Sequence, residues 1–247
     1  MKRTEKTSTQ FGDIVYGIHP IIELLKAKKR RPITCYTLKT QIKSWKSIQP
    51  LLAPYKVTVH HVDREKLNQV AGSTEHQGIV VVAAPFVFKK SCFDPKKQPF
   101  IVLLDGVQDV RNAGAIIRSA YCTGVNGIVL CKKDGAPMTG ATLKASAGLA
   151  ERMEIYQASS VSAAIQEITK AGYTIYVTAL GGKKNALELS YKKPLCVIIG
   201  NEEKGVSSES LKAGTIVTLP QSSPDVSYNA SVAAGIILFW ISNHQEN

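Results

Sequence analysis

The 247-residue sequence predicts an α/β protein in which a small α/β domain precedes a larger domain with a mostly parallel sheet. Apolar segments of strand length alternate with amphipathic segments of helix length, a pattern typical of parallel sheets covered by helices on both faces. A stretch rich in proline and lysine, Ala84–Pro99, separates two such regions. We therefore expect a first domain at residues 1–88 and a second at residues 98–247.

The first domain is expected to contain helices and strands in alternation. Its predicted helices are Pro20–Ala27 and Ser44–Tyr55, and its predicted strands are Ile33–Leu38, Lys56–Val62 and Gly78–Ala83.

In the second domain the alternation is clearer. The predicted strands are Phe100–Leu104, Gly127–Cys131, Arg152–Tyr156, Thr174–Thr178, Leu195–Gly200 and Thr215–Leu219. The predicted helices are Asn112–Thr123, Ala141–Ala147, Val161–Ala171 and Asn229–Ser242. Ligands of such sheets bind at the carboxyl ends of the strands.

The charge of the chain is strongly positive and unevenly distributed. The net charge is +12, and residues 1–88, with 14 basic and 6 acidic side chains, carry +8 of it. The densest cluster is KAKKRR, Lys26–Arg31. A basic surface of this kind favours RNA or another polyanion as partner, although a solvated helix end is an equally ordinary explanation of the cluster.

Several other classes of protein do not fit the sequence. The five cysteines form no C-x-x-C pair and the histidines lack metal-ligand spacing, so we expect a reducing compartment and no metal site. Residues 1–13 are polar, unlike a signal peptide, and the longest uncharged apolar run, Ala230–Ile241, is too short to span a membrane. A cytoplasmic protein is the natural expectation.

The common nucleotide and hydrolase motifs are missing. No G-x-G-x-x-G follows a strand, and no G-x-S-x-G occurs. Gly200–Gly205 (GNEEKG) has the glycine spacing of a phosphate loop, but Val206 and Ser207 stand where Lys and Ser or Thr are needed. A dinucleotide, ATP or hydrolase site is therefore not expected.

Three polar, glycine-containing or serine-rich segments each follow a predicted apolar strand. They are Asp105–Ala120, Ile198–Ser207 and Leu219–Ala233. Polar loops on an apolar parallel scaffold are where α/β enzymes keep their sites. Taken singly, each has a plain structural explanation: Asn112 and Asn229 as helix N-caps, Glu202 as a solvated acid and Arg118 as a surface residue.

Together the three segments resemble motifs 1, 2 and 3 of the SpoU/TrmH family in the SPOUT class of RNA methyltransferases. The matching residues are Asp109, Asn112, Gly114 and Arg118 in motif 1, Gly200, Glu202 and Gly205 in motif 2, and Ser227, Tyr228, Asn229, Ala230 and Ser231 in motif 3. Tyr16–Leu25 and His76–Val81 are similar to the RNA-binding domain of the RlmB-like subgroup. Val110 and Tyr228 depart from the usual Pro and Leu of the motifs, and leave the polar side chains intact.

The resemblance implies a trefoil-knotted methyltransferase domain that binds S-adenosyl-L-methionine and forms a homodimer. Thr178, Gly200, Leu219 and Tyr228 are the expected cofactor-binding residues, with Gly200 allowing close approach to the ligand. The implied reaction is 2′-O-ribose methylation of RNA. Arg118 would stabilise the developing alkoxide, and Asn112, Glu202, Ser227 and Asn229 would position the reacting groups.

The basic first domain favours ribosomal RNA over transfer RNA, and the resemblance to the RlmB-like subgroup implies a guanosine of large-subunit ribosomal RNA as the substrate, in rRNA processing. Two alternatives remain open. The substrate of the same chemistry could be transfer RNA, or the chain could be a non-catalytic RNA-binding relative. The retained polar motif residues argue against the second.

Overall fold

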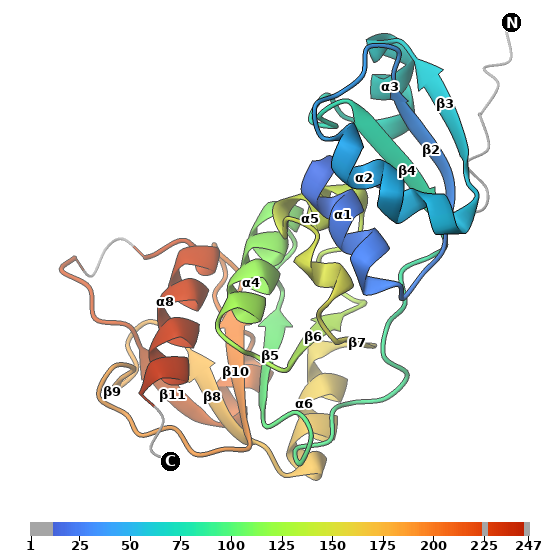
Figure 1. The fold of residues 1–247 in the computed structure, drawn as a ribbon. Helices are drawn as coiled ribbons and strands as arrows, with labels where there is room; N and C mark the ends of the chain where they lie inside the picture. Colours follow the sequence, from blue (N-terminus) through green and yellow to red (C-terminus); the bar gives the residue numbers. More distant parts are fainter. Residues whose placement is uncertain (1–11, 224–226, 245–247) are drawn as a thin grey trace, which may run out of the picture. The chain divides into compact units, whose positions relative to one another are not determined.

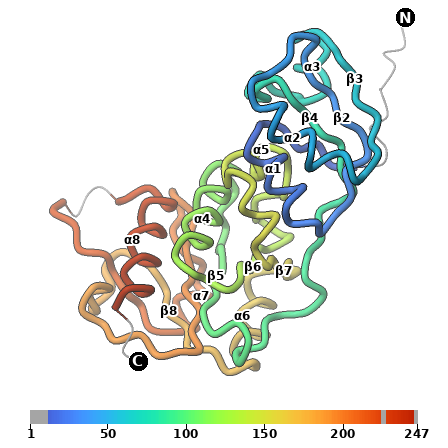
Figure 2. The backbone as a smooth tube through the Cα atoms, viewed as in Figure 1, coloured from blue at the N-terminus to red at the C-terminus, as the bar shows by residue number. Residues whose placement is uncertain are grey.

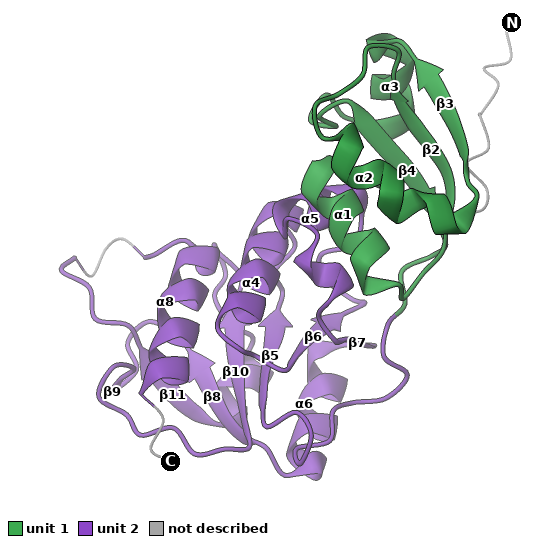
Figure 3. Ribbon diagram, viewed as in Figure 1, with its two compact units in different colours: residues 1–87 green, residues 88–247 purple. Residues whose placement is uncertain are grey.

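The computed structural model describes residues 12–223 and 227–244. The chain divides into two compact units, one ending at Val87 and the other beginning at Phe88 (Figure 3). Most of the polar N-terminal stretch, together with residues 224–226 of the third polar segment, lies outside the described residues. Each unit is described by itself below.

The first unit is a four-stranded sheet with the strand order β1-β4-β2-β3; Figure 1 labels β2, β3 and β4 of this sheet. β4 pairs antiparallel with β1 and β2, whereas β2 and β3 are parallel. The strands are β1 Asp13–Tyr16, β2 Pro32–Leu38, β3 Thr58–Val62 and β4 Ile79–Ala83. The helices are α1 Ile18–Ala27, α2 Trp45–Leu52 and α3 Arg64–Ala71, with a 3-10 turn, η1 Ala53–Tyr55. The expected helices and strands are present, and β1 and the polar helix α3 are additional.

One member of the basic cluster is a structural residue of the first unit. Arg30 is buried, and its Nη1 donates to Asp13 Oδ2 at 2.9 Å and to the carbonyl of Ala84 at 3.0 Å. Its guanidinium also lies 5.3 Å from the centre of the Phe86 ring. These contacts fix the end of the unit against its first strand, so Arg30 is neither a solvated helix end nor an RNA contact.

The second unit is built on a seven-stranded sheet whose paired strands are all parallel. The strand order is β7-β6-β5-β10-β8-β11-β9, so β10 lies between β5 and β8. The bounds are β5 Phe100–Asp105, β6 Gly127–Cys131, β7 Ile155–Ala158, β8 Thr174–Thr178, β9 Lys184–Asn185, β10 Leu195–Gly200 and β11 Thr215–Thr218. The expected α/β class with a mostly parallel sheet is confirmed, and the trefoil knot stays a prediction.

Helices cover the sheet as the alternation predicts. They are α4 Val110–Cys122, α5 Gly140–Ala145, α6 Val161–Ala171, α7 Ser208–Ala213 and α8 Ala230–Asn243, with a 3-10 turn η2 Leu149–Glu151. α4 packs against α5 and α8 (Figure 1), and α6 packs against α7. Ile101 and Leu103 of β5 share a core with Ala164 and Ile168 of α6. Because successive side chains of a strand point to opposite faces of the sheet, the β5 residues next to Ile101 and Leu103 face away from α6.

Two expected boundaries are wrong for local reasons. α4 begins at Val110, because the Asp109 side chain caps it by accepting from Arg111 N at 2.8 Å, so Asn112 is not the N-cap. The strand expected from Arg152 begins at Ile155, because the Leu149 carbonyl accepts from both Arg152 N and Met153 N and continues a helical turn there. The short elements α7 and β9 carry too weak a pattern to be predicted.

The last helix leaves an apolar stripe exposed. Val232, Ile236 and Phe239 follow one another along α8 at intervals of four and three residues, so they lie on one face of the helix. Their exposed fractions are 49%, 37% and 60%. Burial in the core therefore explains only some of the apolar side chains of this helix, and the exposed stripe needs another explanation. Within the described residues no helix is both long and apolar enough to cross a membrane.

Candidate active site

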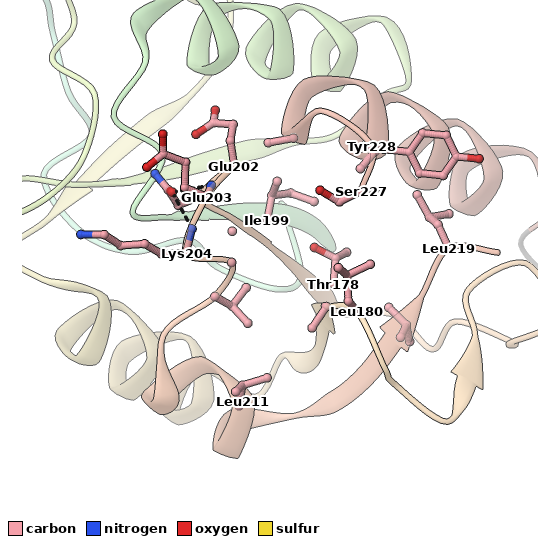
Figure 4. A pocket seen from close by; sticks show the side chains of 18 of the residues that line it. Thr178, Leu180, Ile199, Glu202, Glu203, Lys204, Leu211, Leu219, Ser227 and Tyr228 are labelled. Carbon is pink, nitrogen blue, oxygen red and sulfur yellow. Dashed lines mark hydrogen bonds between the residues drawn. The ribbon is translucent and has the colours of Figure 1, made fainter. Parts of the chain in front are cut away.

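A pocket of about 400 Å³ lies at the carboxyl ends of β8, β10 and β11. The backbone tube of Figure 2 shows how segments distant in the sequence meet in this unit. The pocket is lined by residues 178–180, by 199–206 and by residues between 211 and 233 of the last part of the chain. In Figure 4 the loop after β10 lies on one side of the pocket, with Ser227, Tyr228 and Leu219 on the other.

A buried carboxylate fastens the loop after β10 to the sheet. The parallel register sets Asp105, the last residue of β5, beside Gly200, the last residue of β10. Asp105 Oδ2 accepts from Ser207 N at 2.7 Å, from Ser207 Oγ at 2.8 Å and from Ser210 Oγ at 2.7 Å. Ser207 is in turn the N-cap of α7. Residues 200–207 are therefore held at one end by the pairing of β10 with β5 and at the other end by the Asp105 side chain.

Asn201 shapes the tight turn between these anchors. Its backbone exchanges hydrogen bonds with Gly205, at 2.9 and 3.1 Å. Its side-chain Oδ1 accepts from the backbone N–H groups of Glu203 and Lys204, and its Nδ2 donates to the carbonyl of Gly106 at 2.8 Å. The turn consequently holds the Glu202 side chain at a defined place on the pocket wall.

Motifs 1 and 2 meet directly at the pocket. Asn112, in the first turn of α4, donates from Nδ2 to Glu202 Oε1. Glu202 lines the pocket and is only partly exposed. Asn112 is thus not a helix cap, and Glu202 is not a freely solvated acid. The amide orients the carboxylate and offsets part of the cost of withdrawing it from water.

Gly200 is required by the loop's own backbone. A Cβ built on Gly200 would lie 2.6 Å from the carbonyl carbon of Gly205 and 2.7 Å from the backbone N of Val206. Gly205 itself has a φ of +69°, where glycine avoids strain. The turn's own backbone is thus sufficient reason for a glycine at position 200, and the expected close approach of a ligand stays a prediction.

Gly200→Ala is expected to disrupt the pocket, because rigid backbone must move to admit the methyl group. Affinity for S-adenosylmethionine should fall at least about tenfold, as a shift of 1.4 kcal/mol would require. Gly235→Ala in α8 is the matched control, because its Cβ would meet only Ser119 Oγ, at 3.6 Å. Calorimetric titration of both variants measures the difference, and equal affinities would contradict the steric argument.

The third segment enters the pocket just before α8. Ser227 and Tyr228 line the pocket, and both are exposed. The Tyr228 hydroxyl makes a long contact, 3.4 Å, with the carbonyl of Pro220. Asn229 is the N-cap of α8, as its simplest explanation has it, because its Oδ1 accepts from Ser231 N at 2.9 Å and Ser231 Oγ at 2.6 Å.

The four residues expected to hold a cofactor all line this one pocket: Thr178, Gly200, Leu219 and Tyr228. Thr178 Oγ1 is already a donor to the carbonyl of Ile198, at 2.8 Å. The apolar side chains of Leu180, Ile199 and Val217 complete the wall. The charged residues of the lining are two acids, Glu202 and Glu203, and one base, Lys204. This balance suits a ligand with positive charge better than a polyphosphate.

Arg118 does not line this pocket. It lies six residues beyond Asn112 on α4, about 9 Å along the axis at 1.5 Å per residue. Its side chain is exposed, and within residues 12–223 and 227–244 it forms no hydrogen bond or ion pair. The structure thus joins Asn112 to Glu202 but leaves Arg118 on the outer face of the helix.

The cysteines offer no alternative nucleophile near the pocket. Burial and, to a smaller extent, the nearby carboxylate of Asp105 together raise the pKa of Cys131 to about 12. Burial likewise raises the pKa of Cys196 far above its ordinary value. Both thiols belong to the apolar core around α6 and stay protonated at neutral pH.

Asp105, Asn201, Ser207 and Ser210 were missed as site residues. The sequence offers only a weak signal for this contact. It consists of an Asp at the end of a buried strand and a Ser-rich helix start about a hundred residues later. Only the pairing of β5 with β10 brings the carboxylate and the hydroxyl groups together.

Family models match both units. The model described as the SpoU rRNA Methylase family matches residues 99–239, and the one described as RNA 2'-O ribose methyltransferase substrate binding matches residues 14–88. The chain belongs to the SpoU rRNA methylase family. Membership confirms the expected resemblance and the class of enzyme, an RNA ribose 2′-O-methyltransferase that uses S-adenosylmethionine.

Individual relatives agree with the family assignment. The 23S rRNA (guanosine-2'-O-)-methyltransferase RlmB of Shewanella oneidensis is 32% identical, over 92% of this chain and 95% of its own. The putative TrmH family tRNA/rRNA methyltransferase YacO of Bacillus subtilis is 27% identical, over 94% and 95%. The AdoMet-bound rRNA methyltransferase from Sinorhizobium meliloti, 23% identical, superposes with a TM-score of 0.80 over 96% and 88%, which shows a shared fold.

Proposed function

We propose that this methyltransferase modifies the 2′-hydroxyl of a guanosine in large-subunit, 23S-type ribosomal RNA. The observation that carries the proposal is the pocket at which motifs 1, 2 and 3 of the family meet, with Asn112 bonded to Glu202. The choice of ribosomal RNA and of guanosine rests on the relative from Shewanella oneidensis, which matches both units over nearly their whole length.

The pocket fits S-adenosylmethionine. A volume of about 400 Å³ lies within the range of small-molecule sites, and its wall combines apolar side chains with a few polar groups. When bound, the cofactor supplies a methyl group already activated by a positively charged sulfur. Leu219 and Tyr228 would cover its apolar parts, Thr178 and the backbone at Gly200 would meet its polar edge, and the acidic turn would favour its positive charge.

The catalytic roles proposed for this chain's residues follow from their chemistry. A guanidinium stays protonated at neutral pH, so Arg118 cannot serve as the base. It would donate hydrogen bonds to the 2′-oxygen while the proton leaves to water or to an RNA phosphate. Asn112 and Glu202 act as one bonded pair that orients the ribose. Ser227 and Asn229 would position the reacting groups from the start of α8.

A homodimer would complete the site. Arg118 lies outside its own chain's pocket, and α4, which carries it, packs beside the exposed apolar stripe of α8 formed by Val232, Ile236 and Phe239. Exposed apolar stripes of this kind mark interaction surfaces. We infer that two copies pair through this stripe and that Arg118 serves the pocket of the partner.

A division of labour between the units is also proposed. Residues 1–88 would bind RNA, in keeping with their charge of +8 and the substrate-binding family model, and residues 98–247 would carry the reaction. The segment between them is not a free linker, because Lys89 N donates to the carbonyl of Ile155 and Phe93 is buried in the second unit's core. A cytoplasmic location, where ribosomal RNA is processed, completes the proposal.

Methylation of isolated RNA tests the substrate. The purified protein with labelled S-adenosylmethionine is expected to label unmodified 23S rRNA, or a fragment of it, at one guanosine ribose. Bulk tRNA from the same cells is the comparison, since the relative from Bacillus subtilis is named for both RNAs. Exclusive labelling of tRNA would replace the substrate proposed here, and labelling of neither would favour a non-catalytic relative.

A further inference from the structure

The first unit contains a small cavity of its own, of about 110 Å³, at the carboxyl ends of the parallel strands β2 and β3. Its wall consists of the last residues of β2, the loop that leads into α2, and His61 of β3. None of the family motifs falls in residues 39–46, which read KTQIKSWK; this segment comprises the loop and the first two residues of α2 and is called loop 39–46 below. Carboxyl ends of adjacent parallel strands are a common place for ligands.

Aromatic rings form one side of the cavity. The half-buried Trp45 and the exposed His61 meet edge to face, with ring centres 6.5 Å apart and planes inclined at 63°. Leu38 and Ile42 supply apolar contact on the remaining wall. A flat, partly exposed aromatic surface of this kind suits stacking by an unpaired nucleic-acid base.

Positive charge surrounds the rings without acidic compensation. Lys39, Lys43 and Lys46 are all exposed, residues 39–46 contain no acid, and none of the three ammonium groups has an acidic partner in the described part of the chain. The acid that follows on the β3 side, Asp63, is used to cap α3 by accepting from Lys66 N at 2.8 Å. Lysines spaced along one loop match successive phosphates.

Unused polar groups lie in the same loop. The Ser44 hydroxyl oxygen is buried and has no hydrogen-bond partner among the described residues. Although Ser44 is the N-cap of α2, its side chain makes no capping bond. Ser44 itself is not part of the cavity wall, whereas Gln41, which carries a side-chain amide, lines the cavity. Donors and acceptors beside an aromatic surface are what the edge of a base requires.

We propose that Trp45, His61 and the loop 39–46 form a binding site for one unpaired base of the RNA substrate. The base stacks on Trp45, and its neighbouring phosphates contact Lys39 and Lys43. The site rests on the proposed function of the first unit as the RNA-binding part of the enzyme, and it adds the place and the chemical form of the contact. It also implies that the recognised RNA has a single-stranded loop or bulge.

Tryptophan fluorescence of the full chain tests the stacking directly. The sequence has two tryptophans, Trp45 and Trp240, so Trp240→Phe leaves Trp45 as the only one. A short single-stranded RNA is expected to quench Trp45 in this variant, and a fully paired duplex of the same sequence should quench it much less. The matched variant Trp45→Phe, which keeps Trp240, should show little quenching by either RNA.

Affinity gives a second, independent measure. Trp45→Ala should weaken binding of the single-stranded RNA by about 5- to 150-fold, the usual worth of one stacked base, and Trp45→Phe should restore most of it. This loss should persist at high salt, whereas the loss caused by Lys39→Ala or Lys43→Ala should shrink, because only phosphate contacts release counterions.

Unquenched Trp45 at saturating RNA, with equal affinities for Trp45→Ala and the parent, would overturn the inference. If Trp45→Ala does not fold, the quenching of Trp45 and the Lys39 and Lys43 variants decide the matter without it. Methylation of 23S rRNA by the same preparations separates the two proposals. A chain that methylates RNA without quenching lacks only the base site, and one that quenches without methylating contradicts the proposed function instead.

Discussion

Arg118→Ala is expected to lower kcat for methyl transfer by about a hundred- to a thousandfold, the usual loss when one preorganised donor to a developing anion is removed. Folding and affinity for S-adenosylmethionine should be unchanged, because Arg118 is exposed and lies outside the pocket. Single-turnover transfer of labelled methyl groups to saturating RNA measures the chemical step. Arg118→Lys should recover little, since an ammonium group does not reproduce the planar fork of donors.

Arg111→Ala is the matched control, because Arg111 is also exposed on α4 and keeps its backbone contact with the Asp109 cap. Its kcat should stay within a few-fold of the parent.

Mixing the Arg118→Ala variant with the Asn229→Ala variant then tests whether the proposed dimer shares its active sites. If Arg118 serves the partner's pocket, each heterodimer contains one intact site and activity returns. Absence of recovery in verified heterodimers would place Arg118 and Asn229 in the same chain's site.

Asp105→Ala should produce the largest loss of stability among the site residues. It removes the acceptor of three hydrogen bonds and leaves Ser210, which is fully buried, and the Ser207 backbone N–H without their partner. Unsatisfied buried donors cost about 1–3 kcal/mol each, and hydroxyl groups can turn to other acceptors, so a loss of about 2–4 kcal/mol in unfolding free energy is expected. Denaturant unfolding measures it.

The same substitution should also weaken S-adenosylmethionine binding by more than tenfold, because Asp105 fixes the end of the turn that carries Glu202. Asp105→Asn keeps one oxygen as acceptor and should lose less of both properties. Asp109→Ala provides the control, since it removes a carboxylate that also accepts a bond at a helix start. It should cost about 1 kcal/mol, as for other N-caps, and leave cofactor affinity unchanged. Equal effects of Asp105→Ala and Asp109→Ala on affinity would show that the turn holds its shape without Asp105.

Much of the fold could be predicted because its pattern is local. The buried strands β6, β8 and β10 are continuous apolar runs, and the structure gives them the predicted bounds. The amphipathic α6, with its Ser160 cap and Gly172 after its last residue, also has the predicted bounds. By contrast, the short helix α7 depends on Asp105, and its sequence alone carries too little apolar periodicity to indicate it.

The sequence by itself determined the family, the class of chemistry and the segments that carry it, because motif spacing and apolar periodicity are properties of the chain. Tertiary structure decided what each motif residue touches. Insertion of β10 between β5 and β8 brought Asn112 to Glu202 and Asp105 to Ser207, residues separated by about a hundred positions. It also left Arg118 outside the pocket. Hydrogen bonds between distant segments depend on strand order, which the continuous apolar pattern of strands buried on both faces does not reveal.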